Sequence, residues 1–193
     1  MKLYFVRHGE STSDVKQRYE GDYDDHLTEK GKEEAREIAQ KLLDKGIEII
    51  FSSARIRAVE TSEILCSVLR RELLVMEEFN EQNIYNAYQE LAIEQPEEEY
   101  RKLGELISQR DQKYPNVESY KQLKERVLQG LSHIINRPNQ TVAVVTHGGP
   151  IRCIVREVLQ LGELKGMKNG TIIELKKNDI GFKMVSMDGV SLE

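Results

Sequence analysis

The sequence predicts an α/β fold with a mostly parallel central sheet and helices on both faces. Short apolar runs alternate with amphipathic helical segments along the chain, an order typical of parallel sheets with helical connections. Residues 141–146, Thr-Val-Ala-Val-Val-Thr, are apolar and β-branched, as a central strand buried on both faces should be. The length of 193 residues fits one domain with a substantial core. We therefore expect residues 1–193 to form a single domain.

Local patterns predict the elements of the first half. Residues 3–6 are a short apolar run that ends at a polar cluster, as a buried strand does. Apolar side chains recur with a helical period after Thr28, a suitable N-cap, and the pattern stops at Gly46. Further strands are expected at 47–51 and 73–76, with a helix at 54–71 between them.

The second half begins with a polar segment, residues 80–120, which is rich in Glu and Gln and is expected to be partly helical and exposed. Ser119 is the expected cap of a helix that ends at Ile135. The remaining expected elements are the strand at 141–146, a helix at 151–161, and strands at 171–176 and 181–187 joined by a turn at Asn178-Asp179.

Composition excludes several classes of protein. The formal net charge is −5 at pH 7, whereas nucleic-acid binders usually present a basic face. No apolar stretch is long enough to span a bilayer, and the N-terminus lacks the apolar core of a signal peptide. We therefore expect no nucleic-acid or membrane partner, and a cytoplasmic location. Cys66 and Cys153 lie in apolar helical patterns, where buried thiols in a reducing cytosol are expected and a disulfide is the alternative.

Polar motifs follow three of the expected strands directly. Arg7-His8-Gly9-Glu10 follows the first, Ser52-Ser53 follows the second with Arg57 one helical turn later, and His147-Gly148-Gly149 follows the strand at 141–146. Because ligands bind at the carboxyl ends of strands in such sheets, these histidines and arginines should gather at one edge. Together they would form a positive pocket for a phosphoryl group, since arginine forks match phosphate oxygens in pairs. A neutral histidine nitrogen can attack phosphorus and give a covalent intermediate.

Each of these residues also has a structural interpretation. A lone histidine at a strand end is more often a hydrogen-bonded structural residue, and Arg57 alone could be a surface charge of a helix. Two histidines could bind a metal, but a third ligand with suitable spacing is missing. The other two histidines are His26, in a loop among aspartates, and His133, in a helix. No metal and no other cofactor is therefore expected.

The motifs resemble, in order, those of the histidine phosphatase superfamily, which includes the phosphoglycerate mutases. The match begins at Arg7-His8-Gly9-Glu10 and continues along nearly the whole chain. The further matching segments are Arg18-Tyr19-Glu20-Gly21-Asp22-Tyr23-Asp24 with Leu27-Thr28-Glu29-Lys30-Gly31, Ser52-Ser53-Ala54-Arg55-Ile56-Arg57-Ala58-Val59-Glu60-Thr61, Glu118-Ser119 with Arg126, and Val144-Val145-Thr146-His147-Gly148-Gly149. The resemblance implies a phosphoglycerate mutase-like fold.

The resemblance also implies roles for individual residues. His8 would be the phosphorylated nucleophile, and residues 80–120 would be a variable segment that covers a small phosphorylated substrate. The phosphate clamp would consist of Arg7, Arg57 and His147, and substrate contacts would extend to Asp14, Glu20, Gly21 and Gly148.

The family also has a general acid, a glutamate shortly after the third strand, and Glu81 occupies that place. The leaving alkoxide must be protonated and a later water deprotonated, and one carboxyl can do both if its pKa is raised. Glu77 and Glu78 are close rivals, better explained as ordinary charges at a strand end. The Gly and aromatic residues that usually follow this glutamate are not clearly present in residues 82–88.

Four acidic residues depart from the family's pattern. Asp14 stands where an asparagine is usual, and Glu20, Glu34 and Glu60 stand where glutamines are common. Glu34 and Glu60 are expected to be solvated helix positions. Asp14 would repel a phosphate unless it is protonated, turned away, or paired with a cation such as Lys16 or Arg18.

Three functions fit these observations. The first is a phosphatase that hydrolyses a small phosphate monoester through phosphohistidine, and the second is a phosphoglycerate mutase. The phosphatase is favoured, because the segment between Glu81 and His147 is short and contains no evident pair of arginines that could bind a second anionic group. A non-catalytic binder of a phosphorylated ligand is the third. The sequence leaves the oligomeric state open, a homodimer among the alternatives.

Overall fold

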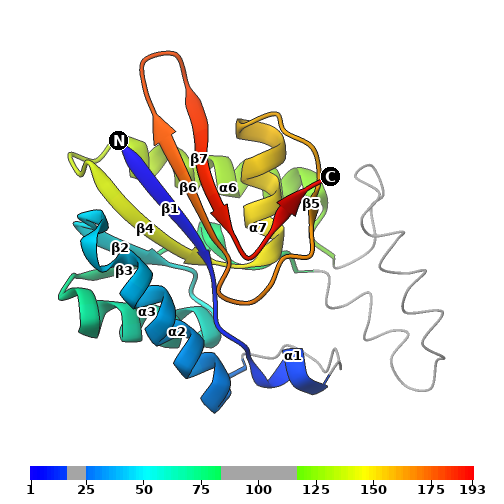
Figure 1. Cartoon of the computed structure of the whole chain (residues 1–193). Helices are drawn as coiled ribbons and strands as arrows, with labels where there is room; N and C mark the ends of the chain where they lie inside the picture. The colour runs from blue at the N-terminus through cyan, green and yellow to red at the C-terminus, as the bar shows by residue number, and fades with distance from the viewer. Residues whose placement is uncertain (17–24, 84–116) are drawn as a thin grey trace.

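The computed structural model describes residues 1–16, 25–83 and 117–193, which form a six-stranded sheet in the order β3-β2-β4-β1-β6-β7 (Figure 1). Strand β6 runs antiparallel to β1, and β7 runs antiparallel to β6. The other neighbouring pairs are parallel, so the expected mostly parallel sheet is confirmed. The strands are β1 (Lys2–Arg7), β2 (Ile49–Ser52), β3 (Leu73–Val75), β4 (Thr141–Thr146), β6 (Ile172–Lys177) and β7 (Phe182–Asp188).

Helices cover both faces of this sheet (Figure 1). Helices α2 (Glu29–Leu42) and α3 (Ile56–Leu69) lie on one face, and α6 (Tyr120–Ile135) and α7 (Gly148–Cys153) lie on the other. Alternate residues of a strand point to opposite faces, so Leu3 and Phe5 of β1 join the core cluster of α6 and α7, whereas Tyr4 and Val6 join that of α2 and α3. Strand β4 is likewise buried on both faces, as its composition predicts.

Capping residues fix where the helices begin and end. The Thr28 hydroxyl accepts a hydrogen bond from the backbone N–H of Gly31 at 3.0 Å, which starts α2. The 3₁₀ turn η1 (Leu43–Lys45) follows α2 and ends at Gly46, whose φ of 73° suits glycine. Ser119 forms a capping box with Gln122 at the start of α6, as expected for this helix.

Two expected helices have different bounds in the structure. Helix α3 begins two residues later than expected, because Arg55 is its N-cap with an extended backbone, and it ends two residues earlier, at Leu69, because Arg70 adopts a left-handed conformation with φ of 54°. The helix expected at 151–161 begins at Gly148, because His147 is its N-cap, and it continues as a π-helix, η3 (Ile154–Val158). Four short elements were not predicted, because they span too few residues for a recognisable sequence pattern: α1 (Thr12–Lys16), η2 (Glu77–Phe79), β5 (Leu164–Lys165) and β8 (Ser191–Leu192).

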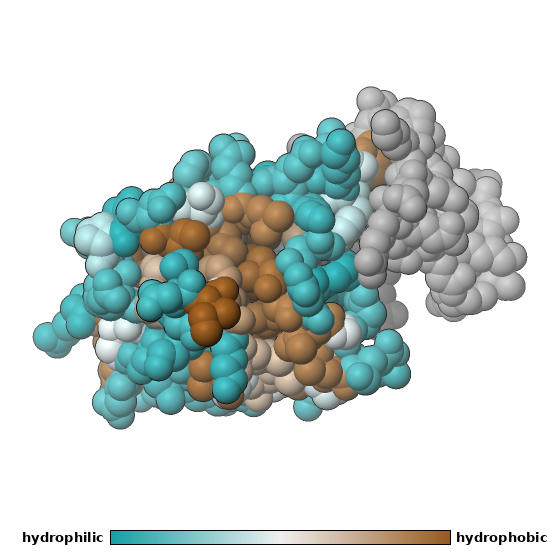
Figure 2. All heavy atoms as spheres, turned by 90° about the horizontal axis from the view of Figure 1, so that it is seen from above, coloured by the Kyte–Doolittle hydropathy of each residue, from teal (hydrophilic) through white to brown (hydrophobic). Residues whose placement is uncertain are grey.

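The surface seen from above carries an apolar area bordered by hydrophilic residues (Figure 2). Large exposed apolar side chains include Ile180, 97% exposed in the turn between β6 and β7, and Val185 on β7.

Within the described ranges, no helix combines the length and the apolar character needed to cross a membrane. Both cysteines are free, Cys153 buried and Cys66 only partly buried.

Candidate active site

The candidate residues lie where parallel strands end, at one edge of the sheet. His8 follows β1, Ser53 follows β2 and His147 follows β4. Backbone hydrogen bonds continue the sheet up to these residues: the His8 N–H donates to the Thr146 carbonyl at 3.1 Å, and the Ser53 N–H donates to the Val145 carbonyl at 2.9 Å. The parallel strands β1, β2 and β4 therefore fix the positions of His8, Ser53 and His147.

His8 is held in one tautomer. Its Nδ1 lies 2.7 Å from the carbonyl oxygen of Gly9, which can only accept, so Nδ1 carries the proton. Its Nε2 accepts a hydrogen bond from Nε of Arg57 at 3.2 Å. Burial, together with the Arg57 charge, lowers the pKa of His8 to about 3. The ring is therefore neutral at pH 7, with its lone pair on Nε2, which is the form that can attack phosphorus.

His147 lies beside His8, with 5.0 Å between the ring centroids. It is fully buried, and its Nε2 lies 2.7 Å from the hydroxyl of Ser53. Burial and then the neighbouring Arg57 and His8 lower the pKa of His147 well below its ordinary value. Its Nδ1 is buried without a hydrogen-bond partner among the described residues. Because buried polar atoms are nearly always paired, this nitrogen is available to a ligand.

Arg7 is partly committed to the protein. Its Nη1 donates to the carbonyl of Met167 at 2.8 Å, and its Nη2 lies 3.3 Å from Oδ1 of Asp14. Its Nε is buried and, within the described part of the chain, has no partner. Arg7 thus keeps one buried donor for a ligand.

Among the described residues, the cation paired with Asp14 is Arg7. Of the two expected cations, Arg18 and the side chain of Lys16 lie outside the described part of the chain. Its other oxygen accepts hydrogen bonds from the backbone N–H and the hydroxyl of Ser11, at 2.9 and 2.8 Å. Burial alone would raise the pKa of Asp14, but His8, the hydrogen bonds from Ser11 and the Arg7 charge hold it below its ordinary value. Of the three alternatives for Asp14, pairing with a cation is the one observed.

The Glu81 side chain lies beside the first residues of α7, in the second histidine motif. Its Oε1 accepts hydrogen bonds from the backbone N–H groups of Gly149 at 3.0 Å and Gln82 at 2.9 Å. A Cβ atom on residue 149 would lie only 2.2 Å from this oxygen. The position of the Glu81 carboxylate therefore depends on a glycine at 149.

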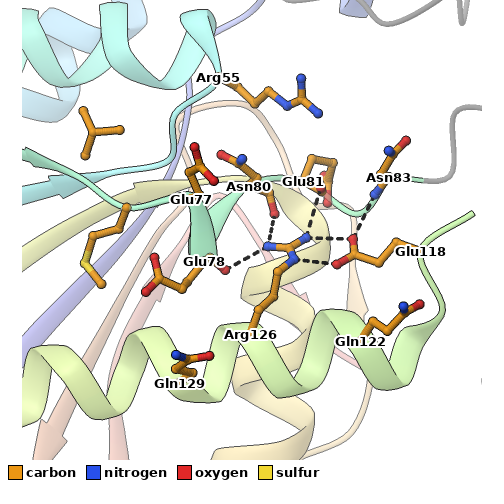
Figure 3. A pocket seen from close by; sticks show the side chains of 12 residues that line it. Arg55, Glu77, Glu78, Asn80, Glu81, Asn83, Glu118, Gln122, Arg126 and Gln129 are labelled. Carbon is orange, nitrogen blue, oxygen red and sulfur yellow. Dashed lines mark hydrogen bonds and ion pairs between the residues drawn. The ribbon is translucent and has the colours of Figure 1, made fainter.

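A cleft of about 840 Å³ extends from Glu81 between η2 and α6 (Figure 3). Arg126 on α6 holds the segment that lines one side of this cleft. Its guanidinium pairs with Glu118 and donates hydrogen bonds to the backbone carbonyls of Glu78, Asn80 and Glu81. Four carboxylates and two guanidinium groups line the cleft: Glu77, Glu78, Glu81, Glu118, Arg55 and Arg126. The rivals of Glu81 as general acid, Glu77 and Glu78, are both in this wall, where Glu78 lies 3.1 Å from His133 Nδ1.

Arg152 is a cation near the site that the sequence did not single out. A Cβ on Gly148 would lie 2.8 Å from Arg152 Nη1 and 3.8 Å from Glu81 Oε2, so both groups lie over this glycine. Burial lowers the pKa of Arg152, while the Glu81 charge opposes this effect and the Arg7 charge adds to it. The only signal in the sequence was its place shortly after the second histidine motif.

Two residues expected to be solvated are instead bonded to loop backbone. Glu34 accepts a hydrogen bond from the Glu10 N–H at 2.7 Å, and Glu60 accepts one from the Leu27 N–H at 2.7 Å. Glu60 also contacts His26, at 2.6 Å. The expectation for Glu34 and Glu60 was wrong because their partners lie in loops far away in the sequence. Glu20 and Gly21 lie outside the described residues.

Among residues 1–16, 25–83 and 117–193, no group of three or more His, Cys, Asp or Glu side chains is arranged to hold a metal ion. The charges that act on His8 include those of Arg57, Arg7 and Asp14, and those that act on His147 include Arg57, Arg55 and Arg7. This arrangement can bind an anion through guanidinium and imidazole groups.

Sequence comparisons agree with this geometry. The model of the histidine phosphatase superfamily (branch 1) matches residues 3–188. An uncharacterized phosphatase, PhoE of Bacillus subtilis (strain 168), is 30% identical over 154 residues, which are 79% of this chain and 75% of that protein. A putative phosphoserine phosphatase 2 of Hydrogenobacter thermophilus is 27% identical over 97% of this chain and 90% of its own, and a probable phosphoglycerate mutase GpmB of Escherichia fergusonii is 28% identical over 83% and 76%.

Solved structures share the fold. Bacillus stearothermophilus YhfR superposes with a TM-score of 0.79 at 21% identity, over 95% of each chain. A putative alpha-ribazole-5'-P phosphatase from Escherichia coli superposes with a TM-score of 0.78 at 18% identity, over 97% of this chain and 96% of its own. At these identities the likeness shows the fold alone.

Proposed function

Since the chain belongs to the histidine phosphatase superfamily, we propose that it hydrolyses a small phosphate monoester through a phosphohistidine at His8. The observation that carries this proposal is the state of His8, a buried neutral imidazole whose Nε2 lone pair faces Arg57. Nearby lie two buried groups without a partner among the described residues, Nε of Arg7 and Nδ1 of His147. Together these groups offer a nucleophile and an anion site without a metal.

The proposed reaction has two displacements. His8 Nε2 attacks phosphorus and the ester P–O bond breaks, while Glu81 gives its proton to the leaving oxygen. A water then attacks the phosphohistidine, its proton passes to Glu81, and the P–N bond breaks to release phosphate. Arg57, Arg7 and His147 would hold the phosphoryl oxygens in both steps, because guanidinium groups match them in pairs. We propose that residues 80–120, of which 84–116 lie outside the described residues, cover the substrate.

The cleft beside Glu81 supports hydrolysis over phosphoglycerate mutation. A mutase must hold the carboxylate of its substrate as well as the phosphate. In this cleft four carboxylates face two guanidinium groups, and that of Arg126 is engaged by Glu118 and three backbone carbonyls. An anionic leaving group would be repelled there, so we propose that the alcohol of the substrate is neutral or cationic.

The third function, non-catalytic binding of a phosphorylated ligand, receives no support from the site. A protein that only binds a phosphorylated ligand needs the guanidinium groups, but it does not need the Nε2 lone pair that the tautomer of His8 provides. Nor does it need a general acid, whereas the Glu81 carboxylate is held in position by two backbone N–H groups. The free cysteines of the described chain suit a reducing cytoplasm, which is the location we propose.

The test is a panel of phosphate monoesters with aryl, neutral alkyl, aminoalkyl and carboxylate-bearing leaving groups, measured by phosphate release. Interconversion of 3- and 2-phosphoglycerate is measured in parallel. We expect hydrolysis of aryl and neutral or cationic alkyl esters and little or no mutase activity. Faster interconversion of the phosphoglycerates than hydrolysis would make the protein a mutase, and failure to release phosphate from any ester would favour the binder.

A further inference from the structure

A chain of hydrogen bonds ties His147 to two residues outside the phosphate clamp. His147 Nε2 lies 2.7 Å from Ser53 Oγ, which lies 2.8 Å from Asn80 Oδ1. The backbone N–H groups of Ala54 and Arg55 also enter this chain, the first to Asn80 Oδ1 at 2.8 Å and the second to Ser53 Oγ at 3.2 Å. Ser53 and His147 are fully buried, so water does not compete for these contacts.

The backbone N–H groups set the direction of every bond in this chain. The Ala54 N–H can only donate, so the Asn80 atom that it contacts is the carbonyl oxygen. That oxygen can only accept, so the single proton of the Ser53 hydroxyl points to it. The Ser53 oxygen must then accept from both the Arg55 N–H and His147. His147 Nε2 therefore carries a proton, and the lone pair of the neutral ring is on Nδ1.

This tautomer is unsuited to bind a fully ionised phosphate. An acceptor nitrogen cannot form a hydrogen bond to an oxygen that has no proton. Yet His147 Nδ1 is buried and without a partner among the described residues, and its ring lies 5.0 Å from that of His8. Among the described residues, the main electrostatic effects on His147 come from Arg57, His8, Arg55 and Arg7, and each of them disfavours a second proton on its ring. Within the described part of the chain, no hydrogen-bond acceptor therefore stabilises a proton on Nδ1.

We propose that Ser53 and Asn80 are positioning residues that make phosphate binding depend on one proton, received by His147 at Nδ1. The inference rests on the proposed function. The proton arrives either on a phosphate monoanion or from the solvent. Nδ1 then donates it to a phosphoryl oxygen, while Nε2–H stays bonded to Ser53. No bond between heavy atoms forms or breaks in this step, and the bound complex holds one proton more than the free protein and a phosphate dianion.

Calorimetry with inorganic phosphate tests this inference without turnover. At about pH 8, where phosphate is mainly a dianion, binding is measured in buffers of different ionisation enthalpy. We expect uptake of about one proton per phosphate. The apparent Kd should rise about tenfold for each further pH unit, because each unit lowers the proton concentration tenfold.

Ser53→Ala removes the acceptor that fixes the tautomer. The neutral ring can then carry its proton on Nδ1, so proton uptake should fall toward zero and the pH dependence of Kd should flatten. Ser52→Ala is the matched control, because Ser52 is equally buried and its hydroxyl donates to the Ser53 carbonyl at 2.8 Å, away from the ring. It should behave as the wild type. If Ser53→Ala does not fold, Asn80→Ala at a partly exposed position frees the Ser53 proton and should also reduce uptake.

Two results would overturn the inference: phosphate binding to the wild type without proton uptake, or unchanged uptake in both Ser53→Ala and Asn80→Ala. A wild-type protein that binds no phosphate would instead contradict the proposed function, and the inference would fall with it. Phosphate binding without formation of a phosphoenzyme would contradict the catalytic proposal and leave the proton measurement valid.

Discussion

Nη2 of Arg7 lies 3.3 Å from Oδ1 of Asp14, so the arginine of the first histidine motif is shared between the site and an aspartate seven residues later. The side chains of this pair are 21% and 26% exposed. An ion pair with this exposure contributes little to stability, roughly 0.2–1 kcal/mol. Its larger effect is on charge, because Asp14 offsets part of the positive potential that an anionic substrate meets.

We therefore expect Asp14→Asn to lower KM for phosphate esters about two- to fivefold at neutral pH, the equivalent of roughly one exposed ion pair. The pKa of Asp14 is held below its ordinary value, so the carboxylate stays charged at about pH 5. Part of the difference should therefore persist there. Steady-state kinetics at both pH values check this. Asp44→Asn, at an exposed position in η1, is the control. An unchanged or raised KM would show that Asp14 does not oppose the substrate.

Glu81→Gln should slow hydrolysis of an alkyl phosphate by about 10²–10⁴-fold. The loss should be clearly smaller on an activated aryl phosphate, because an aryl leaving group needs little protonation. Glu77→Gln removes the same charge from the same cleft and serves as the control. Equal losses on both substrates in Glu81→Gln would assign Glu81 a structural role, and Glu78 would be tested next.

Gly149→Ala should reproduce the Glu81→Gln pattern without altering any ionisable group. The added Cβ would lie 2.2 Å from Glu81 Oε1, which is too close, so the carboxylate must move. The ratio of alkyl to aryl phosphate hydrolysis is the measurement. Gly162→Ala is the control, because its Cβ would meet only the Glu193 carbonyl at 3.9 Å, an ordinary contact. A variant with normal alkyl phosphate hydrolysis would refute this account of Glu81.

Site residues could be predicted from the sequence where they follow a regular strand or helix directly, and not where they lie in loops. The ends of β1 and β4 are marked by apolar runs, so His8 and His147 could be placed at one edge of the sheet. Asp14, Glu34 and Glu60 could not be placed, because each accepts a hydrogen bond from a loop whose course no periodicity predicts. The donors are the backbone N–H groups of Ser11, Glu10 and Leu27.

The link from Asn80 through Ser53 to His147 illustrates the same limit. Ser53 is 27 residues from Asn80 and 94 residues from His147 in the sequence. Each of the three alone is an ordinary polar residue at a strand end or turn. Only the three-dimensional contact shows that the proton of one hydroxyl fixes the tautomer of a histidine. Arg152 was missed for a related reason, because an arginine in a short helix resembles any surface charge.

Hydrolysis should continue at full rate in excess EDTA. Guanidinium and imidazole groups supply the positive charge that a metal would otherwise provide. The measurement compares rates before and after prolonged EDTA treatment, and again after addition of Mg²⁺, Mn²⁺ or Zn²⁺. A loss of activity that a divalent ion restores would refute metal independence.

The most direct test of the central proposal is the identity of the phosphorylated residue. The protein is mixed briefly with an aryl phosphate and quenched in alkali, where phosphohistidine survives, and the labelled peptide is identified by mass spectrometry. Because His8 offers a neutral Nε2 lone pair beside Arg57, we expect phosphate on His8 and none in the His8→Ala variant, which should also lose turnover. Phosphate on His147, or unchanged turnover in His8→Ala, would contradict the account.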